Sequence, residues 1–167
     1  MKNIEIERKW MVRGWPNNLE LLYVEKMRQG YISTSPTVRI RDEDSKYILC
    51  FKSKGKLSRK EIEMEIPKDK FDELEDLIGL PLIDKVRKTY LLSDGHHLEV
   101  NLVDEGTSTE FYYAEVEFSN EEEALAFNPQ DVNLGDYLND EVTYQKGQSM
   151  AAYWIETRGN KQWRCMC

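Results

Sequence analysis

Alternation of charged and apolar residues along short segments is the feature that most constrains how this chain can fold. Residues 4–10 read IEIERKW, with charges at positions 5, 7 and 9 and a further charge, Arg8, on the face of the isoleucines. Because successive side chains of a β-strand point to opposite faces, Glu5, Glu7 and Lys9 share one face of a strand, and the two isoleucines share the other. The same alternation recurs along most of the chain, which predicts a protein built mainly of antiparallel strands.

The pattern also predicts where the other elements lie. We expect strands over Glu5–Val12, Glu25–Ile32, Thr37–Arg41, Tyr47–Ser53, Arg59–Ile66, Leu82–Leu92, Leu98–Val103 and Phe111–Phe118, and helices over Pro16–Leu22, Lys68–Ile78, Asn120–Phe127 and Lys146–Glu156. The helix before Gly79 is the clearest, because its apolar residues recur at helical spacing and glycine commonly ends a helix. His96 and His97 follow a turn and are expected to be exposed. We expect one α+β domain over residues 1–158 and a tail at 159–167.

Charge and cysteine content exclude several classes of protein. The formal net charge of −8 argues against general attraction to nucleic acid or to an anionic membrane surface. No N-terminal apolar run resembles a signal peptide, and no segment reaches the length of a transmembrane helix. Three cysteines, of which Cys165 and Cys167 lie in the tail, do not form a disulfide framework. We therefore expect a cytoplasmic protein with no nucleic-acid or membrane partner.

The charges on these strands are sorted by sign, which an ordinary exposed sheet does not require. On an exposed face, opposite charges on neighbouring strands would pair, and each pair would contribute only a few tenths of a kcal/mol. Like charges along one strand repel one another unless a ligand lies between the strands. Carboxylates alone occupy Glu61/Glu63 and Glu115/Glu117, whereas cations alone occupy Arg39/Arg41 and Lys85/Arg87.

A polyphosphate bound together with a metal ion would satisfy both sets of charges. Arginine donates forked hydrogen bonds to phosphate oxygens, and Mg²⁺ or Mn²⁺ prefers carboxylate oxygens and water. A sheet closed into a barrel with its charged face inward would bring both sets around one ligand. The pattern leaves two interpretations open, which are a charged outer sheet face and an inner site for a polyphosphate and a metal.

Several of these segments occur in an order that resembles a known family. They are Glu5-x-Glu7-x-Lys9, Val38-Arg39-Ile40-Arg41, the strand with Lys52, Arg59-x-Glu61-x-Glu63, Lys85-x-Arg87 and Glu115-x-Glu117. Over residues 4 to 150 they resemble the CYTH superfamily, also called the triphosphate tunnel metalloenzymes. The resemblance implies an α+β fold with a closed eight-stranded antiparallel β-barrel and helices packed outside it. It also implies hydrolysis or transfer at a triphosphate with a divalent metal.

The resemblance assigns roles to individual residues. It implies a Mg²⁺ or Mn²⁺ cofactor held by carboxylates among Glu5, Glu7, Glu61, Glu63, Glu115 and Glu117, with Glu99 as a supporting group. It implies that the phosphates contact Lys9, Arg39, Arg41, Lys52, Lys54, Arg59, Lys85, Arg87 and Lys146. For the catalytic step it implies Lys9, Tyr31 and Glu63. The chain departs from the family pattern at Asn101, where the family often has Asp, and after Lys146, where Gly147 replaces a common Asn.

The function that the resemblance implies is hydrolysis of inorganic tripolyphosphate to pyrophosphate and phosphate. The protein would be a monomer or homodimer whose partner is a small molecule containing a triphosphate. Three alternatives stay open: hydrolysis of thiamine or nucleoside triphosphates, cyclic AMP formation as in class IV adenylyl cyclases, and binding of a polyphosphate or nucleotide without turnover. The glutamates argue against simple binding, because an anion-binding module gains nothing from carboxylates beside its phosphates. Metal binding should weaken at low pH, where clustered carboxylates are protonated.

Overall fold

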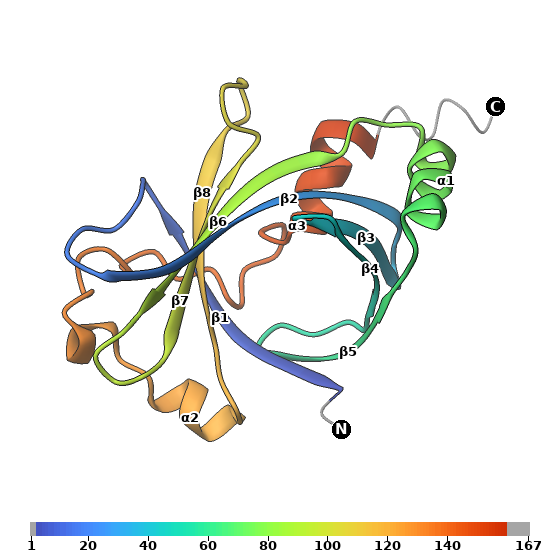
Figure 1. Ribbon diagram of the computed structural model, residues 1–167. Coiled ribbons are helices and arrows are strands. Elements are labelled where there is room, and N and C mark those ends of the chain that lie inside the picture. Colours follow the sequence, from blue (N-terminus) through green and yellow to red (C-terminus); the bar gives the residue numbers. More distant parts are fainter. Residues whose placement is uncertain (1–2, 160–167) are drawn as a thin grey trace.

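Eight antiparallel strands close on themselves to form a barrel (Figure 1). The computed structural model describes residues 3–159. The strands are β1 (Ile4–Val12), β2 (Glu20–Thr34), β3 (Thr37–Glu43), β4 (Lys46–Lys52), β5 (Ser58–Glu65), β6 (Ile83–Leu91), β7 (His97–Val103) and β8 (Phe111–Glu117). Around the barrel their order is β1-β5-β4-β3-β2-β6-β7-β8. Closure pairs every strand on both sides, as the resemblance implied.

The alternation of the strands places the charged side chains inside this barrel. Lys9 of β1 lies opposite Glu115 of β8 in the strand register. The inward-facing cations Arg39, Arg41 and Lys85 are each less than 9% exposed. The interpretation of the charges as an outer sheet face is therefore wrong, and the prediction that they face inward is confirmed.

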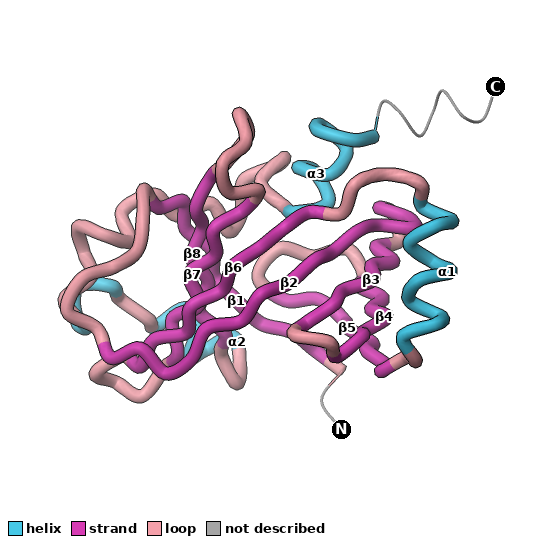
Figure 2. Tube along the Cα trace, turned by 45° about the horizontal axis from the view of Figure 1, so that its top comes forward, coloured by secondary structure: helices cyan, strands magenta, loops and turns pink. Residues whose placement is uncertain are grey.

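Helices cover the outside of the barrel. α1 (Lys68–Ile78) ends at Gly79, whose φ of 66° is a left-handed conformation that glycine adopts at little cost. α2 (Glu121–Ala126) begins after Asn120, whose side chain accepts a hydrogen bond from the Glu123 N–H. A 3₁₀ turn (Pro129–Val132), α3 (Met150–Trp154) and a π-helical turn (Ile155–Gly159) follow. In both views α1 and α3 lie toward one side of the barrel and α2 toward the other (Figures 1 and 2).

The apolar faces of the strands form two clusters between barrel and helices. Trp10 and Val116 belong to the cluster that extends under α2, and both are essentially unexposed. Phe71 of α1 and Trp154 of α3 belong to the second cluster, on the other side. Burial of each large apolar side chain stabilises the fold by about 1.5–3 kcal/mol. The cover is incomplete, since Ile62 on the outer face of β5 is 46% exposed.

Two of the four predicted helices are wrong in whole or in part. Residues 16–19 are irregular, and β2 begins at Glu20, which pairs with Leu91 of β6. Tertiary pairing with β6 thus overrides the local preference for a helix after Pro16. The last helix begins at Met150 rather than four residues earlier. Gly147 has a φ of 78°, incompatible with a continuous helix, and the Ser149 side chain caps the helix that follows.

No helix within residues 3–159 is long and apolar enough to cross a bilayer. Most of the predicted tail, including Cys165 and Cys167, lies outside the described residues. The assignment of residues 1–158 to one domain remains a prediction.

His96 connects the turn between β6 and β7 to α2 and is only 19% exposed, contrary to expectation, whereas His97 is exposed. Its Nδ1 lies 2.8 Å from a carboxylate oxygen of Asp94, and its Nε2 contacts the carboxylate of Glu123. The ring packs edge-on against Phe118 at a centroid distance of 5.0 Å. Burial lowers the pKa of His96, but the two carboxylates raise it by a larger amount, so the net shift is upward. Protonated His96 therefore stabilises the contact between the turn and α2.

We expect His96→Gln to remove a stabilisation that depends on pH. Because the pKa of His96 in the folded state lies above the unfolded value of about 6.5, its contribution is complete below that value and is lost as the pH rises through the folded-state pKa. Urea unfolding should show a variant less stable by up to about 1 kcal/mol in mild acid, with the two curves converging in alkali. A difference that stays constant with pH would contradict this assignment.

Candidate active site

The inward-facing side chains line a cavity of about 500 Å³ to which all eight strands contribute. It brings together all but one of the residues predicted for the site. Lining it are Glu5, Glu7, Lys9, Tyr31, Arg39, Arg41, Lys52, Lys54, Arg59, Glu61, Glu63, Lys85, Arg87, Glu99, Glu115 and Glu117. The exception is Lys146, which is exposed, although the flanking Gln145 and Gly147 lie at the cavity.

One wall of the cavity is cationic because β3 and β6 each present two cations inward. Lys85 is 3% exposed and donates a hydrogen bond of 3.1 Å to the hydroxyl of Tyr113. Burial, and then the charges of Arg87, Arg41 and Arg39, hold the pKa of Lys85 well below its usual range. The four cations repel one another, and the pairing of Arg41 with Glu43 and of Arg87 with Glu99 offsets only part of that repulsion. An anion placed among them would reduce it further.

Two of these cations have donors that the described residues leave without an acceptor. The Nε atoms of Arg39 and Arg41 are buried and lack a hydrogen-bond partner within residues 3–159. A buried donor without an acceptor costs about 1–3 kcal/mol. Phosphate oxygens are acceptors that suit the guanidinium fork. The unpaired donors therefore indicate an anionic ligand at this wall.

The opposite wall is acidic because β1 and β8 bring their glutamates together. Glu7 lies opposite Glu117 in the register and shares a hydrogen bond with Glu115. Burial, and then the charges of Glu115 and Glu5, raise the pKa of Glu7 well above its usual value. Glu117 shows the same upward shift of its pKa, caused by burial and by neighbouring carboxylates. A cation bound among these groups would favour their ionised forms.

The donors on this wall fit a hard divalent cation. Mg²⁺ and Mn²⁺ are bound through carboxylate oxygens and water, and this wall supplies oxygens from Glu5, Glu7, Glu115 and Glu117. Glu7 and Glu115 share a hydrogen bond, and a cation that bound both carboxylates would displace the proton in it. The oxygen donors therefore fit the cofactor that the resemblance implies.

Ion pairs connect β1 with β4 and β5, the two strands that lie between β1 and β3 around the barrel. Lys52 lies 3.0 Å from Glu5 and 3.2 Å from Glu61, and Arg59 lies 3.2 Å from Glu5. Burial raises the pKa of Glu5, but Lys52 and Arg59 lower it more, so the net shift is downward. Burial and a hydrogen bond with Glu5 raise the pKa of Glu61 to about 7. Glu61 is thus partly protonated near neutral pH and can ionise when a cation binds.

Residues 142–151 reach one end of the cavity and contact Lys9. The Lys9 backbone N–H donates to the Thr143 hydroxyl, and the Val142 N–H donates to the Lys9 carbonyl. The Lys9 ammonium donates to the backbone carbonyl of Gln148 and lies 4.3 Å from the centre of the Tyr113 ring. Burial lowers the pKa of Lys9 despite the nearby Glu115 and Glu7.

Three contacts in the site were not predicted from the sequence. Tyr113 accepts the hydrogen bond from Lys85, and it could have been found because it stands two residues before Glu115 on the same strand face. Asn101 accepts a 3.0 Å hydrogen bond from the Nε of Arg87 and so orients that guanidinium. The carbonyl of Gln148 carries no sequence signal, because every residue has one.

The sequence and the fold of this chain are both similar to those of known proteins. The CYTH domain model matches residues 3–133. An inorganic triphosphatase from Nitrosomonas europaea is 34% identical over 145 residues, which is 85% of this chain and 91% of that protein. A crystal structure of an inorganic triphosphatase aligns with a TM-score of 0.62 at 30% identity, covering 89% of this chain and 93% of the other. A putative adenylyl cyclase from Hippeastrum with a dominant triphosphatase activity shares the fold, with a TM-score of 0.56 at 19% identity and coverage of 81% and 88%.

We expect Lys85→Met to stabilise the protein in the absence of ligand. Methionine is unbranched and apolar, so the substitution removes a buried charge that three arginines repel while roughly preserving side-chain volume. The free energy of unfolding in urea should rise by about 1 kcal/mol or more. Lys60→Met, at an exposed position of β5, should stay within about 0.5 kcal/mol of the wild type. A destabilised Lys85→Met protein would show that other groups of the barrel compensate the charge of Lys85 without a ligand.

Proposed function

The chain belongs to the CYTH domain family, and from this premise we propose that it hydrolyses inorganic triphosphate to pyrophosphate and phosphate. The observation that carries the proposal is a barrel cavity with a cationic wall from β3 and β6 facing an acidic wall from β1 and β8. A linear triphosphate with a divalent cation is a ligand with both charges. The similarity to an inorganic triphosphatase supports the choice of substrate.

The cationic wall would bind and orient the phosphates. Arg39, Arg41 and Arg87 would donate paired hydrogen bonds, and the unpartnered Nε atoms of the first two would find acceptors. Lys85 would supply a compact charge between them. Because these groups are fixed in the barrel before the substrate arrives, little reorganisation is needed as charge develops during the reaction.

The acidic wall would hold the cofactor. CYTH triphosphatases generally depend on a metal, and we propose Mg²⁺ or Mn²⁺ bound by Glu5, Glu7, Glu115 and Glu117, near Glu61 and Glu63. When bound, such an ion neutralises charge on phosphate oxygens and acidifies coordinated water. Lys52 and Arg59 already pair with Glu5, and they keep that carboxylate ionised and ready to bind the cation.

We assign the proton transfers to residues at the cavity surface. Glu63, 40% exposed in its side chain, would accept a proton from the attacking water. Lys9 has a pKa lowered by burial and would donate a hydrogen bond or a proton to the leaving phosphate. The hydroxyl of Tyr31 accepts a hydrogen bond of 3.2 Å from the Gln29 amide. Tyr31 is the direct partner of Arg39 in the register of β2 and β3, so its expected role is to hold that guanidinium in place.

The proposed substrate can be tested against the alternatives in one assay. Phosphate release should be measured with tripolyphosphate, thiamine triphosphate and ATP, with Mg²⁺ or Mn²⁺ and with a chelator, and cyclic AMP should be measured with ATP. We expect tripolyphosphate to have the highest kcat/KM and the chelator to abolish turnover. Absence of turnover on every triphosphate would reject the proposed enzyme. Tight metal-dependent binding without turnover would instead indicate a binding module.

We expect Glu7→Gln to lower kcat by about 100-fold or more while the fold stays intact. The amide retains the shape but removes the charge of a cofactor ligand, and loss of electrostatic stabilisation of this kind costs about 10²–10³ in rate. Glu122→Gln makes the same chemical change at an exposed position of α2 and should leave kcat unchanged. Circular dichroism and urea unfolding would verify the fold. Wild-type kcat in Glu7→Gln would remove Glu7 from the metal site.

A further inference from the structure

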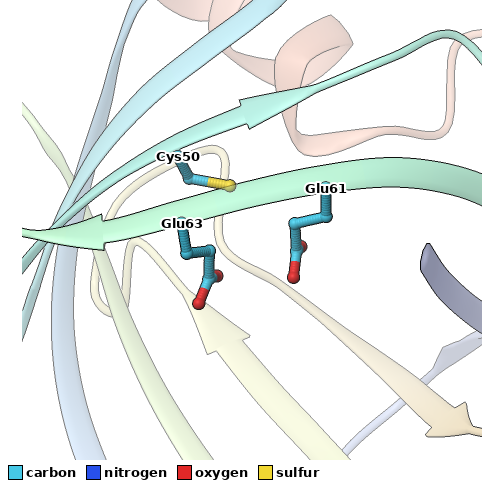
Figure 3. A group of neighbouring side chains, drawn as sticks. All are labelled: Cys50, Glu61 and Glu63. Atoms are coloured by element: carbon cyan, nitrogen blue, oxygen red, sulfur yellow. The ribbon is translucent and has the colours of Figure 1, made fainter. Parts of the chain in front are cut away.

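Cys50 of β4 lies beside two glutamates of β5 in a group of three potential metal ligands. Its Sγ and one carboxylate oxygen each from Glu61 and Glu63 all lie within 4.8 Å of one another. Cys50 and Glu63 are direct partners in the strand register. Figure 3 shows both glutamates extending from β5 to the same side, with the Cys50 side chain on the neighbouring strand. The rigid pairing of β4 and β5 therefore holds the three side chains together.

This donor set has a different chemical preference from that of the acidic wall. Sulfur is a soft ligand that Mg²⁺ avoids, whereas Zn²⁺ accepts sulfur and carboxylate oxygen together. With Zn–S bonds of about 2.3 Å and Zn–O bonds of about 2.0–2.2 Å, the donors of a tetrahedral zinc lie about 3.5 Å apart. The observed donors lie within 4.8 Å of one another, so binding such an ion requires a small rotation of the two glutamate side chains.

Cationic side chains contact the two glutamates of this group, each through one carboxylate oxygen. Lys52 lies 3.2 Å from one oxygen of Glu61, and Arg41 lies 3.7 Å from one oxygen of Glu63. Each carboxylate has a second oxygen that can bind an ion while the first keeps its partner. The Nη2 of Arg39 lies 3.9 Å from Cys50 Sγ, which is a weak contact for a hydrogen bond to sulfur.

The unpaired donor of Arg39, which also belongs to the cationic wall, indicates that a ligand lies on this side of the cavity. Its side chain is beside Cys50, it is only 6% exposed, and its buried Nε has no acceptor within residues 3–159. A three-ligand zinc ion keeps its fourth position open. Arg39 contacts Cys50, so it is close enough to the group to donate a hydrogen bond to an anionic oxygen bound there.

We propose that Cys50, Glu61 and Glu63 form a second cation site, specific for borderline-soft ions such as Zn²⁺ and distinct from the Mg²⁺ or Mn²⁺ site on β1 and β8. Occupation of this site inhibits hydrolysis. A zinc ion on Glu63 removes the carboxylate assigned as proton acceptor, and its open position holds a phosphate oxygen on the β4–β5 side of the cavity. The inhibition rests on the proposed function, whereas the binding does not.

Cobalt binding tests the site without substrate. In a Cys165→Ser/Cys167→Ser protein Cys50 is the only cysteine left. We expect Co²⁺ added to this metal-stripped protein to give a near-ultraviolet thiolate-to-cobalt absorption band, saturating at one ion per chain and abolished by Zn²⁺. Adding Cys50→Ser should eliminate the band. Glu63→Gln should weaken Co²⁺ binding about tenfold or more, whereas Glu65→Gln, an exposed change two residues along β5, should not.

The outcomes separate the site from the proposed function. A missing band in the Cys165→Ser/Cys167→Ser protein, or a band that survives Cys50→Ser, overturns the site. If the band behaves as expected, Zn²⁺ should also inhibit the Mg²⁺-dependent hydrolysis of tripolyphosphate, with about tenfold more Zn²⁺ needed after Cys50→Ser. Equal inhibition of hydrolysis by Zn²⁺ before and after Cys50→Ser would overturn the inhibitory role of the site. If no triphosphate is hydrolysed at all, the proposed function fails, while the cobalt titration still decides the site.

Discussion

Repulsion among buried like charges is the constraint on which the rest of this structure depends. Lys85 lies among three arginines, and Glu7 lies among other carboxylates, in an interior that water cannot fully screen. Each uncompensated buried charge costs several kcal/mol. A closed barrel can sustain that cost because its strands cannot separate to relieve it, and because the two apolar clusters outside the barrel supply the compensating stabilisation. The repulsion is relieved when a ligand with both signs of charge enters.

The separation of the cationic wall from the acidic wall also determines which kind of ligand each part of the cavity can bind. β3 and β6 present guanidinium and ammonium groups, β1 and β8 present carboxylates, and Lys52 and Arg59 pair with Glu5 where the walls meet. Arg41 and Arg87 also pair with the nearby carboxylates Glu43 and Glu99, so the ion pairs are local and the cationic and acidic walls stay distinct. Cys50 adds a third kind of donor at the β4–β5 wall. A single sheet can thus present sites for an anion, a hard cation and a softer cation.

Much of this arrangement could be predicted because strands encode it in a two-residue period. The positions of Glu5, Glu7 and Lys9 follow from alternation, and the motif order identified the eight-stranded closure. The helix expected after Pro16 failed because pairing of β2 with β6 is a long-range contact that local preferences do not contain. Lys146 was placed at the site by its place in a motif, yet Gly147 and the turn around it leave that side chain in solvent. Backbone acceptors such as the Gln148 carbonyl have no signature in a sequence.

The hydrogen bond between Lys9 and the Gln148 carbonyl joins residues 139 positions apart. β1 also pairs with β8, so the first strand to be synthesised must wait for the last before the barrel can close. During that interval its carboxylates have no partner strand on that side, and its apolar face has no cover. Contacts of such long sequence separation slow folding and prolong the exposure of unpaired strand edges. The cavity is therefore completed only at the end of folding, and a chain that stops before residue 111 lacks both the acidic pair on β8 and the strand that closes the barrel.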